Sequence, residues 1–226
     1  MSNIGCNGCA FKSSAGKALL NSEFTVLEEN SALVNFKKGD LIFKQGALST
    51  NVAYLRTGLV KLHMRGPSSE KILRIVKAPS YFGIPTNFGD KINKYSATAL
   101  DITTVCFIDS NLFRNFILKN GKFAYEVIVE LCENELNDYE RYANQSQKQV
   151  HGMVAEALIC MSDKIFKSNR FNLPLTQSEL GNLVGNSRES VSRVLSDFNK
   201  NNIIEFKGKE INIINREVLL QISEKG

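Results

Sequence analysis

The hydrophobic pattern divides the chain into a strand-rich part and a helix-rich part. Between residues 33 and 108, short apolar or β-branched runs alternate with Gly, Asp and Asn at short intervals. Such runs predict strands, of which the clearest cover residues 41–43, 52–55, 59–64, 72–76 and 103–108. Many short strands at this spacing predict a β-barrel, a sandwich or a jelly roll.

Helical periodicity follows the strands. Residues 111–118 predict a short helix and residues 122–143 a long one. The apolar positions of the long helix recur at spacings of 4, 3, 4, 3 and 4, and they are Tyr125, Val129, Cys132, Leu136, Tyr139 and Ala143. This spacing predicts a coiled-coil seam and a parallel homodimer, although a helix that packs against its own β-domain would also explain it. The polar residues 144–149 form the expected hinge after this helix.

Residues 175–198 predict a helix-turn-helix. Thr176 is the expected N-cap of its first helix, and Glu179 completes a capping box. Gly185 allows the tight turn, and Asn186 or Ser187 caps the second helix. An apolar helical face from residue 153 to 165 precedes this unit, and two apolar runs around a glycine turn follow it, at 203–206 and 211–214. These runs predict a two-stranded wing.

The outward face of the second helix carries side chains that suit a DNA major groove. Arg188 and Arg193 match the two acceptors of guanine, and Glu189 can accept from the amino group of cytosine. Ser192 suits a base edge or a phosphate. Lys207 and Lys209 at the tip of the wing suit phosphate. The same pattern would also fit an ordinary amphipathic hairpin with a solvated charged face and a solvated wing tip.

Composition limits the other classes of function. The 226 residues suffice for one large domain or two modest ones, and 43% hydrophobic with 23% charged residues is ordinary for a globular protein. No apolar run approaches the roughly 20 residues of a membrane span, and the N-terminus shows no signal-peptide pattern, so we expect a cytoplasmic protein without a membrane partner. The net charge of +5 permits an anionic partner without requiring one. From residue 148 onward there are 11 Lys and Arg against 9 Asp and Glu, so any basic surface there depends on local placement.

The five cysteines are odd in number and unevenly spread, at positions 6, 9, 106, 132 and 160. This distribution favours reduced thiols or metal ligands over a disulfide framework. The pair Cys6 and Cys9 is not set between a strand and a helix, so a thioredoxin-like site is not expected. His63 is the only histidine of the predicted β-region, so a cupin-like metalloenzyme is not expected either. We therefore expect no enzymatic activity.

The order of β-domain, long helix and winged helix-turn-helix resembles the CRP/FNR family of bacterial transcription regulators. The segments that carry the resemblance are GDLIFKQG at 39–46, YLRTGLVKL at 54–62, NSRESVSRVL at 186–195, NNII at 201–204 and KGK at 207–209. The resemblance implies an α+β fold in three parts. A double-stranded β-helix, or jelly roll of the cyclic-nucleotide-binding type, covers 1–120 as the sensor. A dimerisation helix with its hinge covers 121–147, and a winged helix-turn-helix covers 148–226.

The resemblance also implies a function. A dimer would bind double-stranded DNA at a palindrome with TGA in each half-site, and would work with RNA polymerase. Arg188, Glu189 and Arg193 match the base-reading positions of the cyclic-AMP branch of the family, while Glu189, Ser192 and Arg193 match those of its oxygen-sensing branch. The further expected DNA contacts are Ser187, Thr176, Gln177, Lys207 and Lys209. The rival hypothesis is a small-molecule or metal-binding sensor module without sequence-specific DNA activity.

The signal is expected to differ from cyclic AMP. The family's nucleotide pocket uses a Gly-Glu pair and an Arg-Ser pair, but this chain has Gly83-Ile84 and Tyr95-Ser96 at the matching positions. Isoleucine cannot accept a ribose hydrogen bond, and tyrosine offers no charge to a buried phosphate. These four residues, together with Asp138 and Tyr139 on the long helix, are the expected effector pocket, either filled or open to an apolar effector.

The cysteines offer a second type of signal. Cys6, Cys9 and Cys106 resemble ligands of the [4Fe–4S] cluster in the oxygen-sensing branch, but Ala15 stands where that branch has a third N-terminal cysteine. A cluster would therefore need a ligand other than cysteine. The chain is also compatible with a thiol redox switch, with zinc, or with haem bound through His63, His151 or a methionine.

Overall fold

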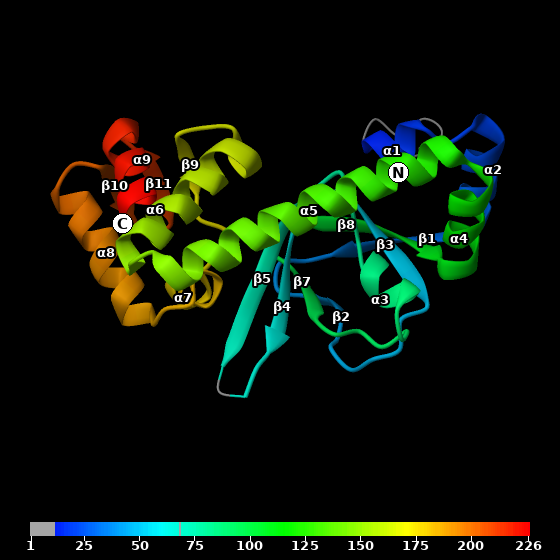
Figure 1. Ribbon diagram of the computed structural model, residues 1–226, viewed down its shortest axis with the longest axis horizontal. Helices are drawn as coiled ribbons and strands as arrows, with labels where there is room; N and C mark the ends of the chain where they lie inside the picture. Colours follow the sequence, from blue (N-terminus) through cyan, green and yellow to red (C-terminus); the bar gives the residue numbers. More distant parts are fainter. Residues whose placement is uncertain (1–11, 68) are drawn as a thin grey trace. The chain divides into compact units, whose positions relative to one another are not determined.

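The computed structural model describes residues 12–67 and 69–226, drawn in Figure 1. These residues form two compact units. The first comprises the described residues up to 65 together with 73–136, and the second comprises 66–72 together with 137–226.

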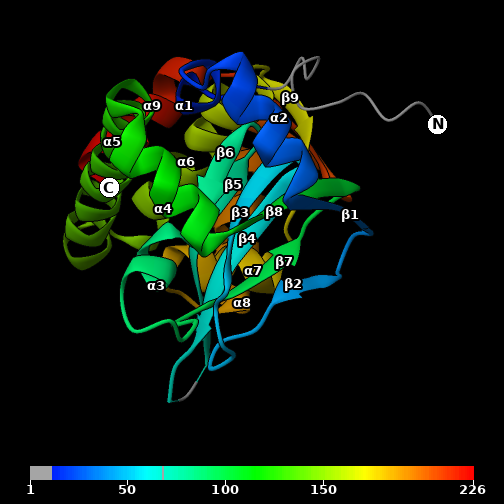
Figure 2. The same cartoon turned by 90° about the vertical axis from the view of Figure 1, so that its right-hand side faces the viewer.

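Two four-stranded sheets build the first unit. The first sheet has the order β1 (Ser31–Phe36), β8 (Thr103–Asp109), β3 (Asn51–Thr57) and β6 (Ser80–Phe82). The second has the order β2 (Leu41–Phe43), β7 (Ser96–Ala99), β4 (Leu59–Arg65) and β5 (Glu70–Lys77). Figure 2 shows β3 and β8 side by side, and they pair antiparallel. Leu55 and Val105 from the first sheet pack in one buried cluster with Val60 and Leu62 from the second, so the core lies between the sheets.

Short helices cover this unit, and most of them escape the hydrophobic pattern. They are α1 (Ser14–Lys17), α2 (Asn21–Glu29), α3 (Ile84–Phe88) and α4 (Ser110–Lys119). Only α4 is predicted, because it is long enough to show a period and because Asp109 caps it by accepting from the amides of Asn111 and Leu112. Helices of four or five residues, such as α1 and α3, are too short to show a repeat.

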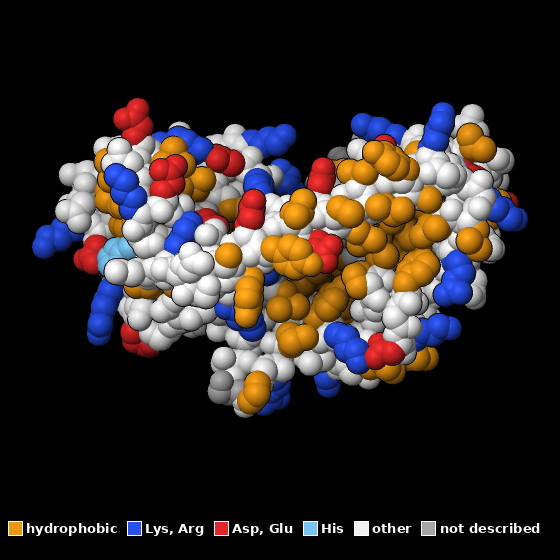
Figure 3. Space-filling view, in the orientation of Figure 1, with side chains coloured by type: hydrophobic (Ala, Val, Ile, Leu, Met, Phe, Trp, Pro, Cys, Tyr) orange, Lys and Arg blue, Asp and Glu red, His pale blue; other side chains and the backbone are white. Residues whose placement is uncertain are grey.

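The long helix α5 (Gly121–Gln147) has two different faces. Phe123 and Val127 are buried in a cluster of the first unit. Figure 3 shows apolar side chains, coloured orange, along the exposed face of the same helix. Tyr125, Leu136 and Tyr139 are 60–64% exposed, so much of the predicted seam is open to solvent.

The long helix extends four residues beyond its predicted end at residue 143 and into the expected hinge at 144–149, because α5 continues to Gln147. Its polar side chains hydrogen-bond neighbouring elements and leave the helical backbone intact. Asn144 Nδ2 donates to Glu156 Oε1 at 2.8 Å, and Gln145 Nε2 donates to the carbonyl of Leu183 at 2.9 Å. The last residue of α5 is Gln147, and Gln149 is already the N-cap residue of the next helix.

The second unit is mainly helical. Its elements are α6 (Val150–Cys160), the π-helical turn η2 (Met161–Phe166), β9 (Arg170–Asn172), α7 (Gln177–Val184), α8 (Arg188–Lys200), β10 (Ile204–Lys207), β11 (Glu210–Ile213) and α9 (Arg216–Lys225). The prediction of a two-stranded wing is incomplete, because β9 adds a third strand in the order β10-β11-β9. Phe171 of β9 stands opposite Ile211 and is buried, but three residues around one aromatic side chain show no strand pattern.

The predicted fold class is confirmed. The chain is a mixed α+β protein with an N-terminal β-domain, a long helix and a C-terminal helix-turn-helix. Within the described ranges, no helix is long and apolar enough to cross a membrane.

Candidate nucleic-acid interface

The first helix of the helix-turn-helix begins at the predicted capping box. Thr176 Oγ1 accepts from the amide of Glu179 at 3.2 Å, and Glu179 Oε2 accepts from the amide of Thr176 at 2.8 Å. Gly185 ends this helix with φ of 77°, a left-handed conformation that favours glycine. Both local predictions about α7 are therefore confirmed.

A second glycine sets the spacing between the two helices. A Cβ atom on Gly181 would lie 2.6 Å from the carbonyl oxygen of Asn186, far inside normal contact. Glycine therefore lets the start of α8 approach the middle of α7. Sequence reasoning missed this role, although a glycine inside a helical pattern is a recognised sign of close packing.

The second helix, α8, begins at Ser187 and presents one polar face. Ser187 Oγ accepts from the amide of Ser190 at 3.1 Å, which decides between the two predicted caps. The buried side of the helix comprises Val191, Val194, Leu195 and Phe198. Arg188, Glu189 and Arg193 are exposed on the other side, and Ser192 is half-buried beside them. These four side chains thus occupy the face expected for base reading.

The carboxylate of Glu189 is held in its charged form. Its own backbone amide and the Ser187 hydroxyl hydrogen-bond it, and the positive charges of Arg188 and Arg193 add to this, so the pKa of Glu189 lies below its usual value. An ionised carboxylate only accepts hydrogen bonds, which is what the amino group of cytosine requires.

The two predicted lysines at the wing tip differ in their surroundings. Gly208 forms the turn with φ of 64°. Lys207 Nζ lies 2.7 Å from Glu205 Oε1, and this hydrogen bond raises the pKa of Lys207. Lys209 is exposed. An exposed ion pair contributes little stability, so a phosphate can replace Glu205 as the partner of Lys207.

One groove brings several of the predicted contacts together. It has a volume of about 320 Å³ and lies between the wing, the start of α7 and the start of α8. Its polar lining includes Thr176, Gln177, Ser178, Arg188 and Lys209. Two cations and the amide groups of a helix N-terminus in one groove form a suitable site for a DNA phosphate.

The predicted nucleotide-pocket positions in the first unit are engaged with each other or with the core. Ile84 is buried in the core cluster, and the hydroxyl of Tyr95 accepts from the amide of Gly83 at 3.1 Å. Burial raises the pKa of Tyr95, so its phenol is neutral. Ser96 Oγ accepts from the amide of Gln45 at 2.9 Å.

The two remaining pocket positions belong to the second unit. Asp138 Oδ1 accepts from Arg141 Nη2 at 3.2 Å, and Tyr139 is 60% exposed. The structure therefore does not bring the six predicted residues together in one unit.

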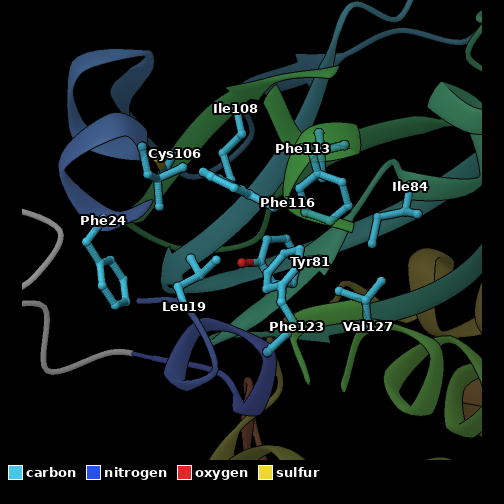
Figure 4. Packing of buried hydrophobic residues seen from close by; sticks show 13 residues of the cluster. Leu19, Phe24, Tyr81, Ile84, Cys106, Ile108, Phe113, Phe116, Phe123 and Val127 are labelled. Carbon is cyan, nitrogen blue, oxygen red and sulfur yellow. The ribbon is translucent and has the colours of Figure 1, made fainter. Parts of the chain in front are cut away.

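The described residues do not by themselves form an iron–sulfur site. Figure 4 shows Cys106 among the buried apolar side chains of the first unit, where it lines a narrow cavity of about 50 Å³. Cys132 and Cys160 are exposed on α5 and α6. Within residues 12–67 and 69–226 no three His, Cys, Asp or Glu side chains gather as a metal site, and Cys6 and Cys9 lie outside those ranges. Cys106 alone supplies too few thiolates to hold a cluster.

The two histidines lie in different units and have partners of their own. His63 Nε2 is 2.8 Å from Thr98 Oγ1, and His151 Nε2 is 3.6 Å from Asp197 Oδ2.

A capped helix pair, an outward polar face on its second helix and a wing define a winged helix-turn-helix DNA-binding protein, here joined to a β-roll sensor domain. The family model described as the Crp-like helix-turn-helix domain matches residues 154–222, and the cyclic nucleotide-binding domain model matches 33–120. The chain belongs to the Crp/Fnr family of transcription regulators.

Curated relatives and solved structures agree with this assignment. The transcriptional activator protein Anr of Pseudomonas protegens is 27% identical over 79% of this chain and 75% of its own length. The CRP-like cAMP-activated global transcriptional regulator of Mycobacterium tuberculosis is 26% identical over 88% of this chain and 91% of its own. The structure of FixK2 from Bradyrhizobium japonicum has a TM-score of 0.77 at 18% identity and covers 85% of this chain and 96% of that one, which supports the fold.

Proposed function

We propose that the chain is a sequence-specific regulator that binds, as a dimer, a DNA palindrome with TGA in each half-site. The observation that carries this proposal is the polar face of α8, with Arg188, Glu189 and Arg193 exposed and Ser192 half-buried, on a helix whose other side is buried. Its arginines suit guanine and its carboxylate suits cytosine, which together read the G·C pair of TGA. RNA polymerase is the partner that such a regulator implies.

The exposed seam on α5 supports a homodimer. Tyr125, Cys132, Leu136 and Tyr139 are exposed at heptad spacing on one face of the helix. A second copy of the same helix offers the complementary knobs and holes, and parallel pairing would give the two-fold symmetry of a palindrome.

Titration of labelled DNA duplexes by fluorescence anisotropy tests the proposal. One duplex carries two TGA half-sites arranged as a palindrome, and the control carries the same bases in scrambled order. We expect the palindrome to bind at least about 10³-fold more tightly at physiological salt. Arg193→Ala should remove most of this preference, whereas Lys225→Ala on α9, remote from the recognition helix in sequence, should keep it.

Equal affinity for both duplexes at all salt concentrations would contradict sequence-specific binding. That result would favour a sensor module without sequence-specific DNA activity.

The proposal extends to the signal, which we infer is not cyclic AMP. The pocket position that would have to receive the phosphate holds the neutral, buried phenol of Tyr95, already bonded to Gly83. The position that would have to accept the ribose hydroxyl holds Ile84, which is part of the core.

A further inference from the structure

A larger cavity in the first unit lies outside these pocket positions. It has a volume of about 520 Å³ and is bounded by α1, by β5 and β6, and by α5. Its wall includes Lys12, Ser13, Arg74, Ser80, Tyr81 and Glu130. None of Gly83, Ile84, Tyr95 or Ser96 lines it. The volume suits a small organic molecule.

Arg74 is the unusual residue of this cavity. Its Nε and Nη1 atoms are buried, and neither has a hydrogen-bond partner within the described part of the chain. These two donors therefore stay unsatisfied, while the charge of Arg74 acts on the carboxylate of Glu130. Buried hydrogen-bond donors are normally paired, and unpaired ones require an explanation.

Side chains of both charges line the cavity: Glu126, Glu130 and Glu133 of α5 lie on its wall together with Arg74, Lys12, Lys17 and Lys77. Glu130 is bonded to other groups. Its Oε1 accepts from Ser80 Oγ at 2.6 Å and from the amide of Tyr81 at 3.1 Å. Burial raises the pKa of Glu130, and the charge of Arg74 opposes that rise only as a smaller effect. Glu130 is therefore held on the cavity wall by β6 and is not a direct ion-pair partner of Arg74.

We propose that this cavity binds a small organic anion, with the carboxylate or phosphate group of the ligand paired to Arg74. The planar guanidinium matches both groups, because each presents two oxygens to its parallel donors. Glu130 lies on the same wall and can accept from a hydroxyl or ammonium group of the same ligand. This site goes beyond the proposed DNA-binding function and does not depend on it, since it lies in the first unit and is tested without DNA.

The first experiment follows thermal unfolding of the full chain with two probes, sodium succinate and sodium phosphate, against sodium chloride at matched ionic strength. We expect a saturable rise in Tm with at least one probe, because a ligand that binds only the folded state stabilises it. A rise with succinate alone identifies a carboxylate site, and a rise with phosphate alone identifies a phosphate site. No saturable rise with either probe overturns the proposal.

Variants separate ligand binding from structural support. Arg74→Met should abolish the anion-dependent rise, and without anion its Tm should equal or exceed that of the wild type, because it removes two unsatisfied buried donors. Lys37→Met, an exposed lysine outside the cavity, should behave like the wild type. An unchanged anion effect in Arg74→Met would overturn the proposal.

A spectroscopic readout on the wild type covers the case in which Arg74→Met fails to fold. The Nε–H resonance of Arg74, assigned by its absence in Arg74→Lys, should shift with the same anion concentration that raises Tm. Arg74→Lys should bind the anion at least about tenfold more weakly, because an ammonium lacks the planar fork. An Arg74 resonance that does not respond to either anion would contradict the assignment.

Discussion

Two residues of the recognition region show how local contacts prepare side chains for DNA. Glu189 stays ionised because hydrogen bonds from its own amide and Ser187, and then its arginine neighbours, favour the charged form. Gly181 carries no side chain, and this allows the close approach of α7 and α8. Glu189 therefore contributes a charged acceptor, whereas Gly181 contributes the absence of a side chain.

Glu189→Gln should weaken discrimination at the cytosine position by about tenfold, because the amide keeps only one acceptor oxygen. In the wild type the pKa of Glu189 is depressed, so this contact persists as the pH falls and is lost only below the ordinary glutamate range near pH 4.3. Binding to matched and single-substituted duplexes between pH 8 and 5 checks both statements. A wild-type preference that declines already between pH 7 and 6 would contradict the assigned role.

Gly181→Ala should destabilise the protein by about 1–3 kcal/mol, because its Cβ forces apart two helices in contact. Urea denaturation followed by far-UV circular dichroism measures the loss. Ser178→Ala on the exposed side of the same helix is the matched control, with an expected change within about 0.5 kcal/mol. An equal free energy of unfolding for both variants would show that α8 can shift to accommodate the Cβ atom without loss of stability.

At the scale of elements, prediction succeeds where adjacent residues determine the structure. The strands with clear apolar runs, the capping box at Thr176 and the left-handed Gly185 follow from neighbouring residues and are present as predicted. The third strand β9 was missed because its one buried residue, Phe171, is recognisable only from its distant strand partner Ile211. Helices as short as α1 and α3 were missed because four or five residues show no repeat. The end of the long helix was placed four residues too early because Asn144 and Gln145 satisfy their amides through hydrogen bonds to other elements.

Leu136→Arg in the middle of the exposed seam should shift a dimer towards monomer, because it places two like charges opposite each other in an apolar contact. Sedimentation velocity at micromolar protein measures the change. Leu118→Arg makes the same substitution at another exposed leucine, on α4 and outside the seam, and should leave the oligomeric state unchanged. A wild type that sediments as a monomer at these concentrations would contradict the proposal that this face of α5 forms a homodimer.

At the scale of the whole molecule, the DNA-reading surface was far more accessible to sequence reasoning than the sensor. The recognition side chains lie on one helix, so their spacing alone places them on one face. Arg74 and Glu130 lie 56 positions apart on a strand and a helix, and neither belongs to a recognisable motif. No local pattern indicates hydrogen-bond donors that lose their partners only when the chain folds.

Cyclic AMP should leave the whole protein unchanged. At millimolar concentration we expect no shift of Tm and no change in affinity for the palindrome, because Ile84 and Tyr95 supply neither the acceptor nor the charge that the nucleotide requires. Calorimetric titration of cyclic AMP into the protein gives an independent measurement. Saturable heat with one site per chain would show that other residues perform both tasks.

The ion pair at the wing tip has a consequence for the counterions of DNA. Lys207 already neutralises Glu205, so when it turns to a phosphate the freed carboxylate attracts a cation from solution. This uptake offsets part of the cation release that normally drives binding, and the slope of log K against log salt becomes shallower. Glu205→Gln should therefore steepen that slope by up to about one unit, whereas Glu224→Gln on α9 should not change it. The carboxylate of Glu205 thus acts as an internal counterion of Lys207, and it makes the DNA affinity of the wing less sensitive to ionic strength.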